Sequence, residues 1–195
     1  MSALRDAPAS FVFSPENLER AKAAMANYPA GREASAVLAL LDLAQRQCGG
    51  YVPHAALDYV ADLLDMPRIR VYEVASFYTM LNLKPVGRHH VQVCTTTPCW
   101  LRGSEAIVKA CETALGIGLG AVTADGQFSL VEVECLGACV NAPMCQINDD
   151  FYEDLTPESA TRILEAFKRG ETPKTGSQSG RQTSAPASGL TTLKD

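Results

Sequence analysis

The chain has 195 residues, 47% of them hydrophobic, and a formal net charge of −5. These values are typical of one globular domain plus an appendage, and the acidic balance argues against nucleic acid as a partner because no overall basic surface is left for phosphates. The longest apolar run, residues 34–44, includes Asp42 and is far shorter than the roughly 20 residues of a membrane span.

The first eighty or so residues carry four helix patterns. Ser14 and Pro15 are typical of a helix start, because serine caps the first turn and proline suits its first position. The other three helices are predicted across residues 37–44, after Pro53 and from Pro67. Four short helices in succession predict an N-terminal helical bundle over residues 1–84.

From about residue 88 the apolar period changes to that of strands. Residues 90–94 and 128–135 alternate between apolar and polar side chains, and a helix is predicted between them at 104–115. Two short strands around a turn at 148–150 and a final helix from Thr156 follow. The order β, α, β, β, β, α predicts an α/β domain with one mixed sheet over residues 85–170.

The C-terminal residues 171–195 are rich in Ser, Thr, Gly and Pro. They hold too little apolar surface to offset the entropy of ordering, so the isolated tail is expected to be flexible. Residues 189–193, "GLTTL", restore some apolar character. They favour a segment that docks on a partner subunit, while a plain flexible terminus stays open as the alternative.

Seven cysteines occur in a chain whose N-terminus lacks the pattern of a secretory signal. An odd number of cysteines without an export signal argues against a disulfide framework. We therefore expect metal or thiol chemistry in a reducing compartment.

Four of the cysteines form two close pairs. The first pair is Cys94 and Cys99, and the second pair is Cys135 and Cys139. Each pair follows a predicted strand, so two adjacent strand ends can bring the four thiols together. Four converging thiolates indicate an iron–sulfur cluster or a zinc ion.

A [2Fe–2S] cluster with four thiolates carries a charge of −2, or −3 after reduction, and needs hydrogen-bond donors around its sulfurs. Residues 95–97, all threonine, supply hydroxyl and amide donors, and Gly137 allows a close backbone approach. Trp100, Leu136 and Val140 are expected to exclude water.

Structural zinc remains an alternative because the spacings also suit zinc. A C-x-x-C redox pair is absent from the sequence, and none of the three histidines lies in the cysteine loops, which argues against a Rieske centre.

The remaining cysteines are Cys48, Cys111 and Cys145, for which we expect packing roles as small apolar side chains. Cys145 is close enough in sequence to the second pair to be an alternative ligand. Pro143 follows Asn-Ala and precedes a predicted strand, and we hypothesise a cis Ala142–Pro143 peptide bond there.

Three segments carry a family resemblance: residues 93–105, "VCTTTPCWLRGSE", residues 133–149, "VECLGACVNAPMCQIND", and residues 71–80, "VYEVASFYTM". Over residues 15–169 the chain resembles the thioredoxin-like [2Fe–2S] subunit of respiratory complex I, the NADH:quinone oxidoreductase. The resemblance implies one binuclear cluster bound by both cysteine pairs, on a thioredoxin-like domain that follows a helical region. Related subunits of NAD-reducing hydrogenases and NAD-dependent formate dehydrogenases are alternatives.

The function implied by this resemblance is one-electron transfer. The sequence holds neither a G-x-G-x-x-G segment nor a P-loop, so we expect no catalytic site on this chain. By resemblance, the cluster exchanges electrons with FMN on an adjacent, larger subunit that binds NADH. The other peripheral-arm subunits are further partners. The complex would place the chain peripherally on the cytoplasmic side of a bacterial inner membrane, or on the matrix side in a mitochondrion. A free-standing ferredoxin and a zinc-stabilised interaction module remain the rival classes.

Overall fold

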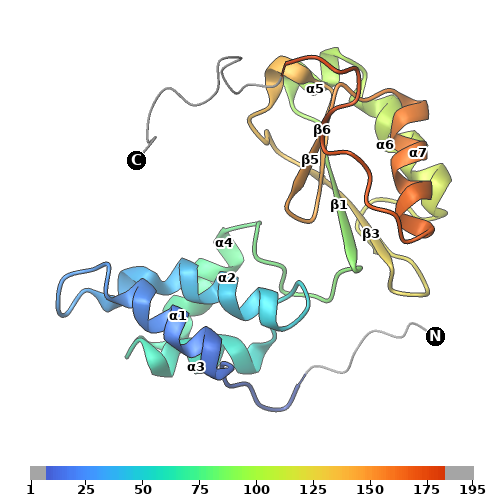
Figure 1. The fold of residues 1–195 in the computed structure, drawn as a ribbon. Helices are drawn as coiled ribbons and strands as arrows, with labels where there is room; N and C mark the ends of the chain where they lie inside the picture. The colour runs from blue at the N-terminus through green and yellow to red at the C-terminus, as the bar shows by residue number, and fades with distance from the viewer. Residues whose placement is uncertain (1–7, 183–195) are drawn as a thin grey trace. The chain divides into compact units, whose positions relative to one another are not determined.

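The computed structural model describes residues 8–182, which divide into two compact units (Figure 1). The first unit ends at Val86 and the second begins at Gly87, two residues beyond the boundary expected from the sequence. No helix among the described residues has both the length and the apolar content needed to cross a membrane.

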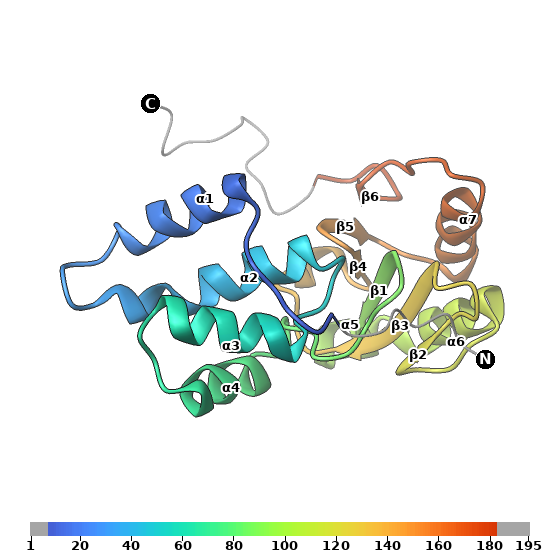
Figure 2. The ribbon, with the colours of Figure 1, turned by 90° about the horizontal axis from the view of Figure 1, so that it is seen from below.

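The first unit is the helical bundle predicted from the sequence. Its elements are α1 (Pro15–Met25), the 3-10 helix η1 (Glu33–Ala36), α2 (Val37–Gln47), α3 (His54–Leu63) and α4 (Arg68–Phe77). The Ser14 side chain caps α1 by accepting a hydrogen bond from the N–H of Asn17 at 3.2 Å. Helix α2 contacts α1, α3 and α4 (Figure 2) and buries Leu40 and Leu41 completely. The apolar stripe read from the sequence is therefore the core of this unit.

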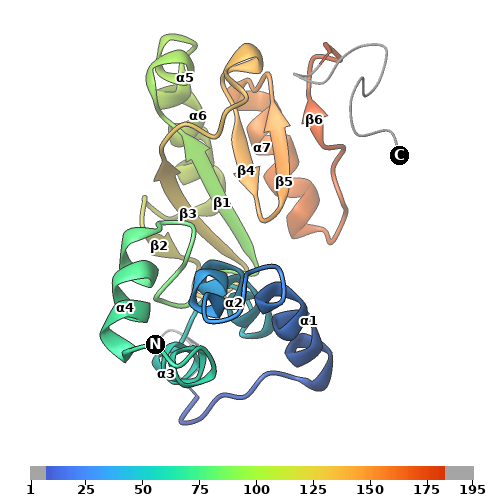
Figure 3. The ribbon, with the colours of Figure 1, turned by 90° about the vertical axis from the view of Figure 1, so that its left-hand side faces the viewer.

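The second unit is a six-stranded mixed sheet with helices. Its elements are β1 (His89–Cys94), α5 (Thr97–Leu101), α6 (Ser104–Leu115), β2 (Ala121–Val122), β3 (Phe128–Val133), the 3-10 helix η2 (Cys139–Asn141), β4 (Cys145–Ile147), β5 (Asp150–Glu153), α7 (Pro157–Lys168) and β6 (Gly176–Ser177). The strand order is β2-β3-β1-β4-β5-β6, with β1 parallel to β3 and antiparallel to β4. Helices α6 and α7 contact each other on one face of the sheet (Figure 3). The expected α/β class and mixed sheet are confirmed.

Four short elements of this unit were not predicted, among them the three-residue η2. Helix α5 lies in the segment expected to be a loop, and Pro98 occupies its first turn. Strands β2 and β6 each have two residues. Elements of two to five residues are too short to show an apolar period, and pairing with distant strands determines them.

The prediction of a flexible tail from residue 171 is wrong for its first part. Gly176 and Ser177 form β6, which pairs in parallel with β5 through Tyr152 and Glu153. The polar composition of this segment gave no sign of sheet pairing, because its stabilising contacts are with residues more than twenty positions earlier. The predicted docking segment 189–193 lies outside the described residues. The hypothesis of a cis Ala142–Pro143 peptide bond is confirmed.

Candidate metal centre

The parallel pairing of β1 and β3 brings the two cysteine loops to the same edge of the sheet. Cys94 is the last residue of β1 and lies opposite Val133, the last residue of β3. The carboxyl ends of parallel strands meet at one edge, so the loop holding Cys99 and the loop holding the second pair start side by side. This register therefore places the starts of both cysteine loops next to each other.

The first pair is buried. Cys94 and Cys99 are each only 1% exposed, and they form a small apolar cluster with Ala138, Ala142 and Met144. The backbone N–H of Cys94 donates to the carbonyl of Met144 at 3.2 Å, joining the end of β1 to the start of β4. Close packing therefore determines where these two thiols lie.

The second pair lies at the surface. Cys135 and Cys139 are both exposed, and their Sγ atoms are 3.3 Å apart. Cys139 begins η2. Gly137, between them, has a φ of +85°, a left-handed conformation that glycine adopts without the steric penalty of a side chain.

The two loops exchange hydrogen bonds with each other's cysteines. The hydroxyl of Thr96 lies 3.3 Å from Cys94 Sγ and also hydrogen-bonds Cys135 in the opposite loop. The backbone of Leu136, in the second loop, hydrogen-bonds the Cys94 thiol in return. Of the three threonines proposed as donors, Thr96 is the one whose hydroxyl contacts thiols of both pairs.

Each pair contains one thiol that ionises more readily and one that ionises less readily. Burial opposes ionisation of Cys94, but hydrogen bonds from Thr96, Leu136 and Cys99 lower its pKa overall, whereas burial and the hydrogen bond to Cys94 raise the pKa of Cys99 to about 12. In the second pair a backbone hydrogen bond from Gly137 lowers the pKa of Cys135, and the hydrogen bond to Cys135 raises that of Cys139. In each pair one thiol therefore loses its proton more readily than the other, and binding of a metal would require both to be deprotonated.

The donor set consists of two thiol pairs on neighbouring loops. Among residues 8–182, no group of three or more His, Cys, Asp or Glu side chains is arranged to hold a metal ion. The thiols instead form two pairs, linked by Thr96 and Leu136. A [2Fe–2S] cluster needs two thiolates for each iron and donors to its sulfurs, and the residues present fit that requirement.

The expected apolar shield is only partly present. Leu136 packs against the small cluster that contains the first pair. Trp100 and Val140 are 55% and 62% exposed, so the prediction that they exclude water is wrong within this chain. The indole N–H of Trp100 donates to Glu105 at 3.1 Å, which holds the ring at the surface.

None of the other three cysteines belongs to the apolar cluster that contains the first pair. Cys111 and Cys145 are buried in the core between the sheet and its helices, and burial raises the pKa of both thiols. Cys48 is half-buried at the C-terminal end of α2. These positions agree with packing roles, and Cys145 belongs to a different apolar cluster from the first pair.

One residue near the site had no signal in the sequence. Arg181 donates to the backbone carbonyl of Val140, directly after Cys139, at 2.8 Å. The partners of its side chain are 27 to 41 positions earlier in the chain, so no local pattern could have identified it.

Comparisons with known proteins agree with the fold and the cysteine pattern. The thioredoxin-like [2Fe–2S] ferredoxin family matches residues 21–168, which include both cysteine pairs. An NADH-quinone oxidoreductase subunit of Rickettsia bellii is 58% identical over 82% of this chain and 95% of its own length. A mitochondrial NADH dehydrogenase [ubiquinone] flavoprotein 2 of Dictyostelium discoideum is 51% identical over 94% of this chain and 74% of its own length.

A solved structure shares the fold at lower identity. An NAD⁺-reducing [NiFe]-hydrogenase superposes with a TM-score of 0.59 at 21% identity, over 69% of this chain and 23% of the hydrogenase chain. That likeness concerns the fold alone. From the family match and the high identity to its relatives, the chain belongs to the thioredoxin-like [2Fe–2S] ferredoxin family.

Proposed function

We propose that the chain is the [2Fe–2S] electron-transfer subunit of an NADH:quinone oxidoreductase. The observation that carries the proposal is the parallel register of β1 and β3, which starts both cysteine loops at one edge of the sheet. The 58% identity to the NADH-quinone oxidoreductase subunit of Rickettsia bellii supports the choice of complex.

The proposed ligands are Cys94 and Cys99 for one iron and Cys135 and Cys139 for the other. Bound there, the cluster would supply a site that accepts and releases one electron. The chain's own residues make the site suitable: the first pair holds its thiols by packing, and the Thr96 hydroxyl donates toward both pairs. Donors near the sulfurs stabilise the extra negative charge of the reduced state.

Zinc is the less favoured occupant. A single tetrahedral zinc ion needs four ligands around one point. The described cysteines of the site lie in two pairs on separate loops, one pair buried and the other exposed. Two adjacent pairs with reciprocal hydrogen bonds support a binuclear centre instead.

The proposed partner is a larger subunit that binds NADH and FMN, together with other subunits of the peripheral arm. The sequence of this chain holds no dinucleotide-binding segment, so its part in the reaction is electron exchange and not hydride transfer. Such a complex would hold the chain peripherally on the cytoplasmic face of a bacterial inner membrane, or on the matrix side in a mitochondrion. A hydrogenase host has only the shared fold in its favour.

Anaerobic purification of the full chain, followed by iron and acid-labile sulfide analysis, tests this function. We expect about two irons and two sulfides per chain, as a binuclear cluster requires, and a reddish-brown colour that bleaches on reduction. The Cys48→Ser variant is the matched control and should keep the cluster. Reduction of the cluster by NADH, seen as loss of its colour, should require the flavin-binding partner. A colourless protein that contains zinc would contradict the proposal.

A further inference from the structure

The residues Gly176–Gln182, here called the strap, extend the sheet beyond β5. Strand β6 lies parallel to β5, and the N–H of Gln178 donates to the carbonyl of Glu153 at 2.9 Å. The Ser177 hydroxyl, in a side chain that is nearly buried, donates to Asp154 Oδ2 at 2.6 Å. These contacts fix the strap beside the end of β5.

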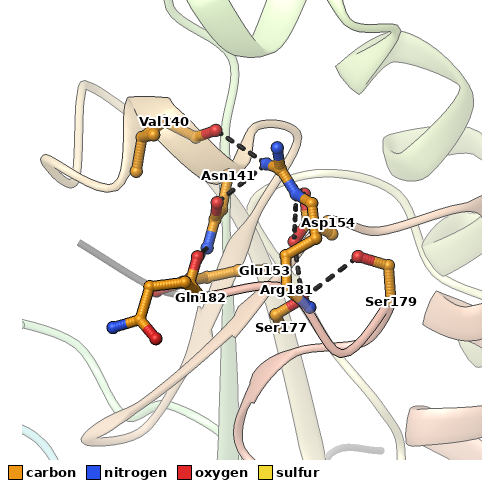
Figure 4. Close-up of polar contacts among 8 residues, drawn as sticks. All are labelled: Val140, Asn141, Glu153, Asp154, Ser177, Ser179, Arg181 and Gln182. Atoms are coloured by element: carbon orange, nitrogen blue, oxygen red, sulfur yellow. Dashed lines mark hydrogen bonds and ion pairs between the residues drawn. The ribbon is translucent and has the colours of Figure 1, made fainter. Parts of the chain in front are cut away.

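Arg181 connects the strap to the turn that follows the second cysteine pair. Its Nη2 lies 2.8 Å from each of three acceptors, among which its two N–H groups are shared: the carbonyl of Val140, Oδ1 of Asn141 and Oδ1 of Asp154 (Figure 4). The carboxylate of Asp154 is only 10% exposed and also accepts from Nε. A planar guanidinium can reach several acceptors at once with fixed geometry, which the single ammonium of lysine cannot reproduce.

Asn141 is the residue of this turn that hydrogen-bonds both the strap and β5. The residue is fully buried, and its Nδ2 donates to Glu153 Oε2 at 2.7 Å and to the carbonyl of Gln182 at 3.2 Å. Its backbone carbonyl accepts from the N–H of Asp154 at 2.8 Å. With Arg181 on its Oδ1, every polar atom of the Asn141 side chain has a partner, as a buried amide requires.

Cys139, two residues earlier, has little packing of its own to fix it. Its side chain and that of Val140 are both exposed. The position of its backbone therefore depends on the buried Ala138 before it and on the hydrogen bonds of the η2 turn. Among these, the bonds to the charged side chains of Arg181 and Glu153 are the stronger kind, because bonds to a charged group exceed those between neutral groups.

We propose that Arg181 is a positioning residue for Cys139. It holds the carbonyl of Val140 and the amide of Asn141, and so keeps Cys139 Sγ at a fixed place beside Cys135. This inference rests on the proposed function, since it takes Cys139 to be a cluster ligand. The strap then belongs to the metal centre, although it follows the last ligand by almost forty residues.

The test compares three variants of the full chain, purified anaerobically with the cluster bound: Arg181→Ala, Arg181→Lys and, as the matched control, Arg169→Ala. Arg169 forms an exposed ion pair with Glu171 instead of contacting the turn. The readouts are the electron paramagnetic resonance spectrum of the reduced cluster and the rate at which a chelator removes iron.

We expect Arg181→Ala to lose iron about tenfold faster, the ratio that corresponds to losing hydrogen bonds of ~1.4 kcal/mol, and to show a changed resonance spectrum. Arg181→Lys should be intermediate, and Arg169→Ala should match the wild type. An unchanged spectrum and rate in a merely less stable Arg181→Ala would overturn the positioning role. Full rescue by lysine would also overturn it, because charge alone would then suffice.

A second variant keeps the test decisive if Arg181→Ala fails to fold. Asp154→Asn leaves the guanidinium in place but weakens the charge pair that orients it, so a smaller change in the same direction is expected. No change in Asp154→Asn would count against the proposal. A wild-type chain without labile sulfide would instead reject the proposed function, and with it the ligand that Arg181 is inferred to position.

Discussion

The two cysteine pairs face the same proposed centre but are held in different ways. The first pair is buried with Ala138, Ala142 and Met144, so packing fixes its thiols. The second pair is exposed and is held by backbone hydrogen bonds, by the left-handed Gly137 and by the contacts of Arg181. One half of the site is therefore part of an apolar core, while the other half is a surface loop ordered by polar contacts.

This difference indicates which changes each half tolerates. A packed site responds to small changes of volume or bond length, because its neighbours cannot move independently. An exposed loop can adjust its backbone, but it is sensitive to the loss of a hydrogen-bond partner.

Replacing one ligand in each half should give the largest effect. Serine forms a shorter bond to iron than cysteine does, so the backbone must move to keep the ligand. Cys99→Ser, in the buried pair, should retain less than about a tenth of the wild-type sulfide, since a strain of roughly 1–3 kcal/mol accompanies a forced shift in a packed core. Cys135→Ser, in the exposed loop, should keep most of its cluster with a shifted absorption spectrum. Sulfide analysis of both variants provides the measurement.

The control for this pair is Cys111→Ser, which alters a buried thiol away from the site. It should lower the thermal stability and leave the sulfide content unchanged. Equal sulfide loss in Cys99→Ser and Cys135→Ser would show that burial does not distinguish the two halves.

A smaller effect is expected at Thr96, which hydrogen-bonds a thiol in each half. The Thr96→Val variant keeps the side-chain shape but removes the donor, which should destabilise the reduced, more negative state. A net hydrogen bond of about 1 kcal/mol corresponds to a potential roughly 40 mV lower. Redox titration measures this shift. Thr97→Val, at an exposed position of α5, should leave the potential unchanged, and an equal shift in both variants would contradict a specific role of Thr96.

Much of the fold could be predicted from the sequence because its signals are local. Ser14 and Thr156 cap α1 and α7 as predicted, and α6 covers the predicted residues 104–115. The sequence also predicted both cysteine pairs at one edge of the sheet, because each pair follows the carboxyl end of an alternating segment. Parallel pairing of these two segments is enough to bring the loops together. The assignment of all four cysteines as ligands remains a prediction.

The rest of the site depends on contacts between distant positions. Nothing local separates Thr96 from the threonines on either side, and only the fold brings its hydroxyl to Cys135. Arg181 lies in a segment whose composition predicted flexibility, yet its partner Asp154 is 27 residues earlier. Long-range polar contacts of this kind leave no periodic pattern in a single sequence.

The smallest expected effect tests whether the exposed half also approaches the cluster with its backbone. Gly137 and Gly103 both have left-handed φ values, +85° and +91°, and a methyl group at either position would meet no protein atom within 4 Å. Alanine at each should therefore cost about 1 kcal/mol of folding free energy from backbone strain alone, measured by chemical unfolding. If the loop around Gly137 passes close to a sulfide, Gly137→Ala should in addition speed iron loss to a chelator several-fold, whereas Gly103→Ala should not. Equal rates of iron loss would mean that glycine is needed in this loop only for its conformation, and that the exposed pair reaches the cluster through its thiols alone.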